Sequence, residues 1–474
     1  MIWPRWLQFL CGRPSSRARV SPTRLAGAVS AATVVFGVAW IGKADSNRPM
    51  TEGRARPRTA ALRAVTARRE PAVAPAPGGM DESDLYIVNL NGTGLRRLTY
   101  QAGPDVLPSI SPDGRVLAYC HHGSLCARRV DRPSVNVLLA PAPGGDMLCF
   151  SPKFSPNGLR ILYSMAIVFP PGKPVPKKRP ENEIRLIKPD GTDQRTLTTG
   201  DAPQFGPDGK RIVFWIWNAD AKRSEVRLIN TDGRNLRTIG TGSTPILSPD
   251  GRTIAVTEYV AEKDIIEVRL MNTDGSNLRN LGQGVNPVFS PDGALLLFDR
   301  EYEVAAGGTA SPSPRARRLG GPWRFRSQSL VTYVLAGPDT GKRFEPKYEE
   351  RGFAELDARF SPDGRKIVFV RQAEHKDDAG QGLWVMDFDR SHAQRVMNYS
   401  GIRFPSFTPD GRSIVCNWNG DLCLMNADGA RRMLLTSGIG VEDYEFMPDG
   451  RRLLLKARSD GEPWWHVGTP VLLP

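Results

Sequence analysis

The sequence lacks the motifs by which many enzymes are first recognised. Its 474 residues contain no Gly-x-Ser-x-Gly nucleophile elbow, no phosphate-binding loop, no dinucleotide fingerprint and no His-Glu-x-x-His zinc motif. Histidine occurs only five times, in scattered places, so the sequence offers no histidine-rich metal site. These absences remove the common sequence signatures of catalysis, and we therefore expect neither a cofactor nor a metal.

Basic residues are abundant, but they are unevenly distributed along the chain. The sequence carries 64 basic and 50 acidic residues, a net charge of +14. Residues 1–80 hold 13 of the basic and 3 of the acidic residues, so the rest of the chain is nearly balanced. The basic pI belongs mostly to this N-terminal segment, and we expect no nucleic acid to bind the folded part.

The first 80 residues have the order of a targeting segment followed by a linker. Five arginines within residues 1–24 precede an uncharged stretch at 25–42, as in a secretory signal or a signal anchor. Such a stretch would span a bilayer and leave the body of the chain in a bacterial extracytoplasmic or periplasmic space. The protein would be membrane-anchored if the stretch stays and secreted if it is cleaved. Residues 43–80, rich in Ala, Arg and Pro, are expected to form a disordered linker.

From residue 81 onward the chain repeats a short turn motif. Ser-Ile-Ser-Pro-Asp-Gly at 109–114 returns in seven more copies, which end at Gly158, Gly209, Gly251, Gly293, Gly364, Gly411 and Gly450. Apolar residues alternate with polar ones on both sides of each copy, which is typical of a β-hairpin. The turn residues agree, because Pro presets φ, Asp bonds the local backbone and Gly accepts a left-handed conformation.

A second hairpin motif is interleaved with the first. It occurs as Leu-Tyr-Ile-Val-Asn-Leu-Asn-Gly at 85–92 and Ile-Arg-Leu-Ile-Lys-Pro-Asp-Gly at 184–191, with further copies ending at Gly233, Gly275 and Gly429. Two hairpins per repeat make four short antiparallel strands, and such units must stack around an axis to bury both faces. The sequence therefore predicts an all-β propeller at 81–474. Pairing the hairpin at 85–99 with the one at 444–457 would give eight blades, while seven would result if residues 458–474 built outer strands.

These residues closely resemble the TolB-type (WD40-like) β-propeller repeat, also found in the propellers of prolyl oligopeptidase-like enzymes. The resemblance covers roughly residues 82–457 and implies the propeller fold. TolB has a separate α/β domain before its propeller, whereas here we expect only the linker before the first strand. The hydrolase domain of the prolyl oligopeptidase-like enzymes has no counterpart in the motifs of this chain.

Three connections are longer than the repeat requires. They lie at 165–182, 300–328 and 371–382, and alternating turns would place all three on the face opposite the Pro-Asp-Gly turns. Loops of variable length on a rigid scaffold often bind ligands, and two of these insertions are basic. The candidate ligand-binding residues are Lys173, Lys177, Lys178, Arg179, Arg315, Arg317, Arg318, Trp323, Arg324 and Arg326. The alternative is that the insertions are disordered, solvated surface loops.

The cysteines and a charged repeat complete the candidate features. Cys120 and Cys126 flank one short loop, Cys416 and Cys423 flank the corresponding loop of another blade, and we predict a disulfide within each pair. Buried free thiols are the alternative. Glu-x-Arg recurs at 183–185, 225–227 and 267–269, which suggests either a charged ladder or, preferably, ion pairs between adjacent blades.

Three functions are compatible with this sequence. The first is a non-catalytic propeller that is tethered to the membrane and binds a protein or an acidic surface polymer. The second is a propeller enzyme, a polysaccharide lyase or hydrolase, with a site in the central channel. The third is a Tol-Pal-like component of the cell envelope.

Overall fold

The structure is a computed structural model, and it describes residues 83–100, 105–132, 136–140, 147–167, 181–305, 324–345, 353–373 and 380–458. The predicted N-terminal segment (1–24), anchor or signal (25–42) and linker (43–80) lie outside these residues. In the part of the chain that the structure describes, no helix is long and apolar enough to cross a membrane. Every regular element of that part is a β-strand.

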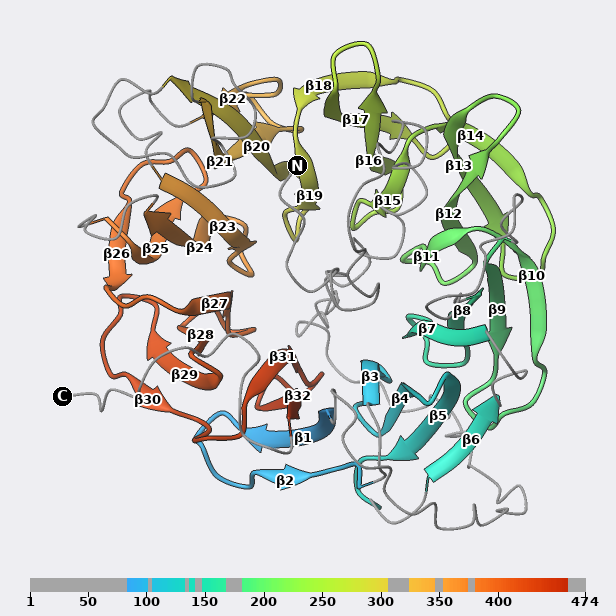
Figure 1. The fold of residues 1–474 in the computed structure, drawn as a ribbon, viewed down its shortest axis with the longest axis horizontal. Coiled ribbons are helices and arrows are strands. Elements are labelled where there is room, and N and C mark those ends of the chain that lie inside the picture. Colours follow the sequence, from blue (N-terminus) through green and yellow to red (C-terminus); the bar gives the residue numbers. More distant parts are fainter. Residues whose placement is uncertain are drawn as a thin grey trace, which may run out of the picture. The chain divides into compact units, whose positions relative to one another are not determined.

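The fold is a β-propeller of eight four-stranded antiparallel blades (Figure 1). The chain divides into two compact units, one containing Leu98–Pro245 and the other combining Asp84–Arg97 with Ile246–Pro474. The blades of the first unit are built from β3 (Asp105–Ile110), β4 (Val116–His121), β5 (Ser124–Arg129) and β6 (Asn136–Ala140); β7 (Met147–Phe154), β8 (Ile161–Ile167), β9 (Glu183–Ile187) and β10 (Arg195–Thr199); and β11 (Asp201–Phe205), β12 (Arg211–Asn218), β13 (Arg223–Asn230) and β14 (Arg237–Thr241).

The second unit holds the remaining sheets, and the boundary between the units falls within β15. The sheets are β15 (Ser243–Leu247), β16 (Thr253–Val260), β17 (Ile265–Asn272) and β18 (Arg279–Gln283); β19 (Val285–Phe289), β20 (Leu295–Ala305), β21 (Arg324–Val334) and β22 (Arg343–Phe344); β23 (Phe353–Phe360), β24 (Lys366–Ala373), β25 (Gly382–Asp387) and β26 (Gln394–Met397); β27 (Ile402–Phe407), β28 (Ser413–Trp418), β29 (Asp421–Asn426) and β30 (Met433–Leu434); and a last sheet in the order β2 (Arg96–Arg97), β1 (Ser83–Asn89), β32 (Arg452–Arg458) and β31 (Val441–Phe446).

The last sheet joins the two ends of the described chain. β1 lies beside β32, and the backbone amide of Leu90 donates a hydrogen bond to the carbonyl of Arg451 at 2.9 Å. Val88, Leu453 and Leu455 are buried together in one apolar cluster at this junction. The expected pairing of 85–99 with 444–457 is therefore confirmed, and with it the count of eight blades rather than seven.

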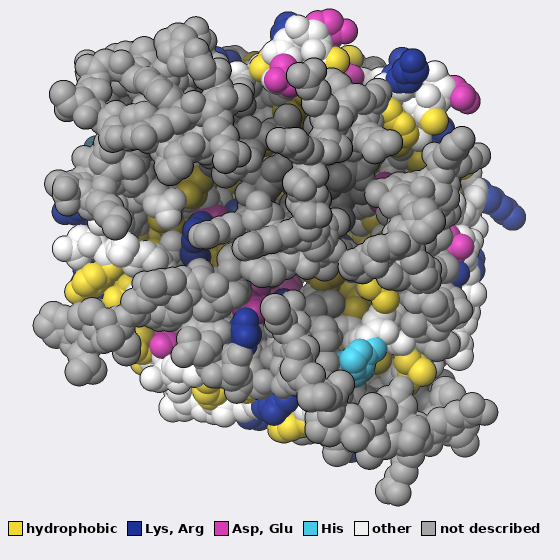
Figure 2. Space-filling model, in the orientation of Figure 1, with side chains coloured by type: hydrophobic (Ala, Val, Ile, Leu, Met, Phe, Trp, Pro, Cys, Tyr) yellow, Lys and Arg dark blue, Asp and Glu magenta, His cyan; other side chains and the backbone are white. Residues whose placement is uncertain are grey.

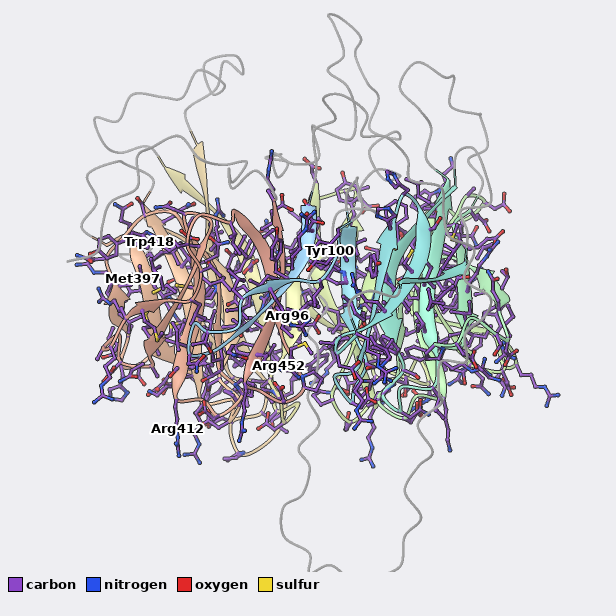
Figure 3. The ribbon with its side chains drawn as sticks, turned by 90° about the horizontal axis from the view of Figure 1, so that it is seen from below. Arg96, Tyr100, Met397, Arg412, Trp418 and Arg452 are labelled. Atoms are coloured by element: carbon purple, nitrogen blue, oxygen red, sulfur yellow. The ribbon has the colours of Figure 1, made fainter. Side chains whose placement is uncertain are left out.

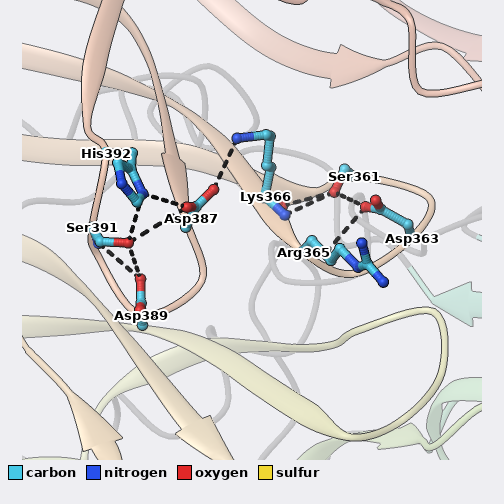
Figure 4. Close-up of polar contacts among 8 residues, drawn as sticks. All are labelled: Ser361, Asp363, Arg365, Lys366, Asp387, Asp389, Ser391 and His392. Atoms are coloured by element: carbon cyan, nitrogen blue, oxygen red, sulfur yellow. Dashed lines mark hydrogen bonds and ion pairs between the residues drawn. The ribbon is translucent and has the colours of Figure 1, made fainter.

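The Pro-Asp-Gly turns are held by the side chains that the motif supplies. In the turn of β23 and β24, the Ser361 hydroxyl donates to Asp363 at 2.6 Å and accepts the amide of Lys366 at 2.9 Å (Figure 4). Asp363 also accepts the amide of Arg365 at 3.1 Å, and Gly364 adopts a φ of 71°. Each turn thus satisfies its own backbone amides while Gly takes the left-handed conformation that closes the hairpin.

The core lies between the faces of neighbouring blades. Five of the eight second strands carry an aromatic side chain at an equivalent position, and these side chains are fully buried: Tyr119, Tyr163, Phe214, Phe298 and Phe369. The other three strands have the buried Val256, Cys416 and Leu455 there. Within the first unit, one cluster combines Leu125 of β5 with Ile161 of β8, and so belongs to two successive blades. Because a single blade leaves both its faces open, stacking supplies most of the apolar burial.

Candidate functional site

The three insertions all lie in the connection between the second and the third strand of a blade. The structure places them between β8 and β9, β20 and β21, and β24 and β25. Figure 3 shows the geometry within one blade of the second unit: Arg412, in a Pro-Asp-Gly turn, and Trp418, at the far end of β28, lie at opposite ends. Each insertion therefore leaves its blade at the end opposite the Pro-Asp-Gly turn, as the sequence predicted.

The insertions are shorter than the sequence suggested, because strands extend into them. β20 and β21 have 11 residues each, and their pairing continues to Glu303 opposite Arg326 and Ala305 opposite Arg324. Two predicted ligand-binding arginines thus belong to a strand, which corrects the loop assigned to 300–328. The other two insertions are shortened in the same way by β8, β24 and β25. The remaining candidates lie outside the described residues: Lys173, Lys177, Lys178, Arg179, Arg315, Arg317, Arg318 and Trp323.

The described lysines and arginines do not gather into one patch on the face shown in Figure 2. On the face shown in Figure 2, the described lysines and arginines are dispersed among acidic and apolar side chains. Figure 2 therefore adds no binding surface of one charge to the candidates that the insertions supply.

A polar site that the sequence did not reveal lies on the first strands of the second unit. These strands contain β-bulges, where the pairing shifts by a residue and one residue adopts a left-handed conformation. That residue is Asn286 on β19 (φ 53°), Asp357 on β23 (φ 55°) and Phe404 on β27 (φ 49°). A bulge turns a side chain away from the regular alternation and often occurs near functional sites. The strict period-2 pattern of the sequence concealed it.

Three carboxylates and one arginine, the Arg359 cluster, lie at or beside such bulges. Asp357 and Arg359 are on β23, Asp443 is at a bulge of β31, and Asp299 of β20 lies opposite the bulged β19. The amide of Asn286 donates to Asp299 at 2.9 Å, and the backbone amide of Phe404 donates to Asp357 at 3.2 Å. Asp443 accepts the backbone amide of Tyr444 at 2.8 Å. Through the bond from Phe404 to Asp357, the cluster also joins two neighbouring blades.

The surroundings of the cluster bring the pKa values of two of its carboxyl groups close to neutral pH. Desolvation raises the pKa of Asp299 to about 7, with a further increase from the negative charge of Asp357. Desolvation also raises the pKa of Asp443 to about 6. The positive charge of Arg359 opposes both increases. Such carboxyls can donate or accept hydrogen bonds near neutral pH, which suits a hydroxyl-rich or cationic ligand.

The described side chains do not assemble a metal centre. Among them, no group of three or more His, Cys, Asp or Glu residues is arranged to hold a metal ion.

The Glu-x-Arg repeats form ion pairs within single strands, not between blades as we expected. Arg185 binds Glu183 at 2.6 Å, and Arg227 binds Glu225 at 2.9 Å. Residues two apart on a strand point to the same face, so the two side chains meet directly. In the third copy Arg269 contacts Glu267 at 3.0 Å and also pairs with Glu258 of the neighbouring strand.

In one turn of the second hairpin motif, an arginine that belongs to a buried ion network stands in the place of the glycine. Where other blades have Gly429 or its equivalents, the turn of β25 and β26 has Arg390 with a φ of 69°. Its guanidinium donates to the carbonyl of Leu330 at 3.0 Å and binds Glu355 at 2.9 Å. Glu355 is 1% exposed and also binds Arg371 at 2.8 Å. Burial would raise the pKa of Glu355, but the two guanidiniums hold it below the ordinary value.

The five described cysteines are buried thiols. Cys416 lies directly opposite Cys423 on adjacent strands, a register that suits a disulfide. The bond between them stays a prediction. Cys120 lies opposite Leu125, and Cys126 lies opposite Tyr119. Because successive strand residues point to opposite faces, this register does not favour the other predicted bond, Cys120–Cys126.

Comparison with known proteins places the fold but not the activity. No family model matches the chain, and no curated protein matches it. A TolB protein from Agrobacterium tumefaciens is 16% identical, with a TM-score of 0.35 over 79% of this chain and 97% of that one. A eukaryotic initiation factor is 14% identical, with a TM-score of 0.50 over 79% and 89%. An oligogalacturonate lyase from Vibrio parahaemolyticus is 13% identical, with a TM-score of 0.43 over 79% and 96%.

The blades and their repeat residues define the class of protein. Eight four-stranded sheets make the chain a β-propeller, and the turns of the Pro-Asp-Gly type between their first and second strands resemble the TolB repeat. At identities below 20% the likeness to solved structures concerns the fold alone. A fold of this kind does not by itself decide whether the chain is catalytic.

Proposed function

We propose that the protein is a non-catalytic, extracytoplasmic scaffold that is tethered to the membrane by residues 25–42. It binds a protein or an acidic surface polymer through the basic connections between the second and third strands. The five arginines ahead of residues 25–42 support export, and the cysteine content is compatible with an oxidising compartment.

One observation carries this proposal: unusual length and positive charge coincide in one class of connection. In two regular blades the corresponding connections are only the short segments 219–222 and 261–264. In contrast, 168–182 and 306–323 are long and contain Lys177, Lys178, Arg315, Arg317 and Arg318. A rigid scaffold with such connections presents cations where a polyanion can approach.

Binding to a defined acidic polymer tests the proposal. We expect the full chain to bind polygalacturonate and not uncharged dextran, and the affinity to fall as salt is raised. Replacing five insertion arginines by Gln should weaken binding at least tenfold: Arg315, Arg317, Arg318, Arg324 and Arg326. The matched control replaces five exposed arginines of the Pro-Asp-Gly turns, at the opposite ends of their blades, and should bind as the wild type does: Arg115, Arg252, Arg365, Arg412 and Arg451. Equal losses in both variants would contradict the proposed surface.

The same assay separates the two alternatives. A lyase acting on polygalacturonate would generate an unsaturated product, and a hydrolase would generate new reducing ends. Turnover would favour the propeller enzyme, and Asp299 and Asp443 would then be the first groups to substitute, because their pKa values suit general acid–base work. Binding to Tol–Pal components without polymer binding would favour the envelope alternative.

A further inference from the structure

Two cysteines from neighbouring blades of the first unit meet in one apolar cluster. Cys120 lies on β4 and Cys149 on β7, and their side chains are 1% and 2% exposed. Both belong to the cluster that contains Leu125 and Ile161. After burial, the neighbouring Cys149 thiol is the next largest cause that raises the pKa of Cys120. This contact is between blades, whereas sequence reasoning considered cysteines only within a blade.

The backbone holds the two blades together at this point. The amide of Cys149 donates to the carbonyl of Gly123 at 2.8 Å, so the start of β7 is attached to the turn between β4 and β5. Leu148 packs against the same glycine, where a Cβ would lie 2.3 Å from its side chain. This hydrogen bond and the close packing of Leu148 bring the two blades together beside Cys120 and Cys149.

Cys126 is directed away from this contact. It lies opposite Tyr119 and Leu138, whereas Cys120 lies opposite Leu125. Cys126 therefore points to the other face of the sheet, and it is not a member of the cluster that holds the other two cysteines.

We propose that Cys120 and Cys149 form a disulfide that joins two neighbouring blades, with Cys126 left as a thiol. A thiolate of the pair attacks a disulfide oxidant, such as oxidised glutathione or a dithiol oxidase, and gives a mixed disulfide. The second thiolate displaces the oxidant's sulfur, so the protein loses two protons and two electrons and the oxidant becomes two thiols. The inference does not depend on the proposed binding function.

Burial decides when this bond forms. Desolvation raises the pKa of the Cys120 thiol well above its ordinary value, so little thiolate exists in the folded protein. Oxidation should therefore occur while the two blades assemble, before the cluster closes. For this reason the test refolds the full chain from urea in a glutathione redox buffer.

Peptide mapping identifies the bond directly. After refolding, alkylation and tryptic digestion without reductant, Cys120 and Cys126 lie in peptide 116–128 and Cys149 in peptide 130–153. We expect a species whose mass is the sum of these two peptides less two hydrogens, with Cys126 alkylated, and its loss on reduction. A closed loop within peptide 116–128, or alkylation of all three thiols, would overturn the proposal.

Two matched variants make the assignment specific. Cys126→Ala should retain the cross-linked species, whereas Cys149→Ala should lose it and leave Cys120 alkylated. Dithiothreitol should lower the urea midpoint of the wild type and of Cys126→Ala more than that of Cys149→Ala, since only the latter has no interblade bond to lose. The wild-type map alone decides the proposal if a variant does not refold.

Discussion

Arg390 illustrates how one residue can depart from a repeat and still be retained. A non-glycine residue in the left-handed region costs roughly 1–2 kcal/mol, and the repeat elsewhere avoids this with Gly. Here the side chain compensates, because its guanidinium reaches the buried Glu355 and the carbonyl of Leu330. At this position an unfavourable backbone conformation is therefore offset by polar contacts that link two blades of the second unit.

Replacing this arginine should reveal which effect is larger. Arg390→Gly removes the unfavourable backbone conformation. It also removes one of the two guanidiniums that bind Glu355 and leaves that of Arg371. Because an incompletely paired buried charge costs several kcal/mol, we expect a net destabilisation of about 1–3 kcal/mol in urea unfolding. The control is Arg431→Gly, at an exposed residue that is also left-handed (φ 50°), which should be neutral or slightly stabilising. Stabilisation of both variants would show that the ion network contributes little.

Asp299 predicts a specific dependence of stability on pH. Its pKa is about 7 in the folded chain, against an ordinary value near 4 in the unfolded chain. Between these values the folded state holds more protons, so the free energy of unfolding falls as pH rises through this window. Asp299→Asn removes this loss and should raise the urea midpoint more at pH 8 than at pH 5. The exposed Glu262→Gln control should show no such difference; an identical shift at both pH values would argue against the raised pKa.

At the scale of elements, the turns that lack a Ser or Thr hydroxyl have another side chain that binds the turn Asp. Six of the eight Pro-Asp-Gly-type turns begin with Ser or Thr, whose hydroxyl binds the turn Asp or Asn. The other two begin with Gly206 and Met447. There an arginine after the turn binds the Asp instead, Arg211 at 2.9 Å and Arg452 at 2.6 Å. In every copy the side chain of the turn Asp or Asn thus has a side-chain partner as well as a backbone amide.

Removing a turn carboxylate should destabilise the hairpin that it closes. Asp363→Ala loses the bonds to Ser361 and to the amide of Arg365, and each such bond contributes about 1 kcal/mol. We expect a loss of about 1–2 kcal/mol in urea unfolding, given two bonds of that size. Asp220→Ala, at an exposed position between second and third strands, should change stability by less than about 0.5 kcal/mol. A comparable loss in both would assign the effect to charge and not to the turn.

At the scale of the whole molecule, the first and last strands share a sheet, so the ends of the described chain depend on each other. Leu455 of β32 is fully buried beside Val88 of β1. Leu455→Ala should cost about 2–5 kcal/mol, as expected for a buried leucine. Leu434→Ala, where the side chain is 40% exposed, is the matched control and should cost far less. Similar small losses in calorimetric or urea unfolding would mean that this sheet is not part of the cooperative core.

The fold was predictable because its signals are local and repeated. Alternating apolar residues around Ser-Pro-Asp-Gly predict hairpins, and eight copies predict eight blades. The Arg359 cluster was not predictable, because its bulges leave no mark in a period-2 pattern and its members come from strands far apart in sequence. The Glu-x-Arg pairs were assigned to neighbouring blades because the sequence does not show which face a strand residue shares with its own neighbours.

The sequence by itself determined the hairpins, their turns and their number, since each depends on residues within about ten positions of one another. Tertiary structure alone decided which side chains meet: Asp299 with Asp357 and Arg359, Arg390 with Glu355, and Cys120 with Cys149 instead of Cys126. The physical reason is that strand register and blade stacking set these contacts, and neither is encoded in the spacing of residues along one hairpin.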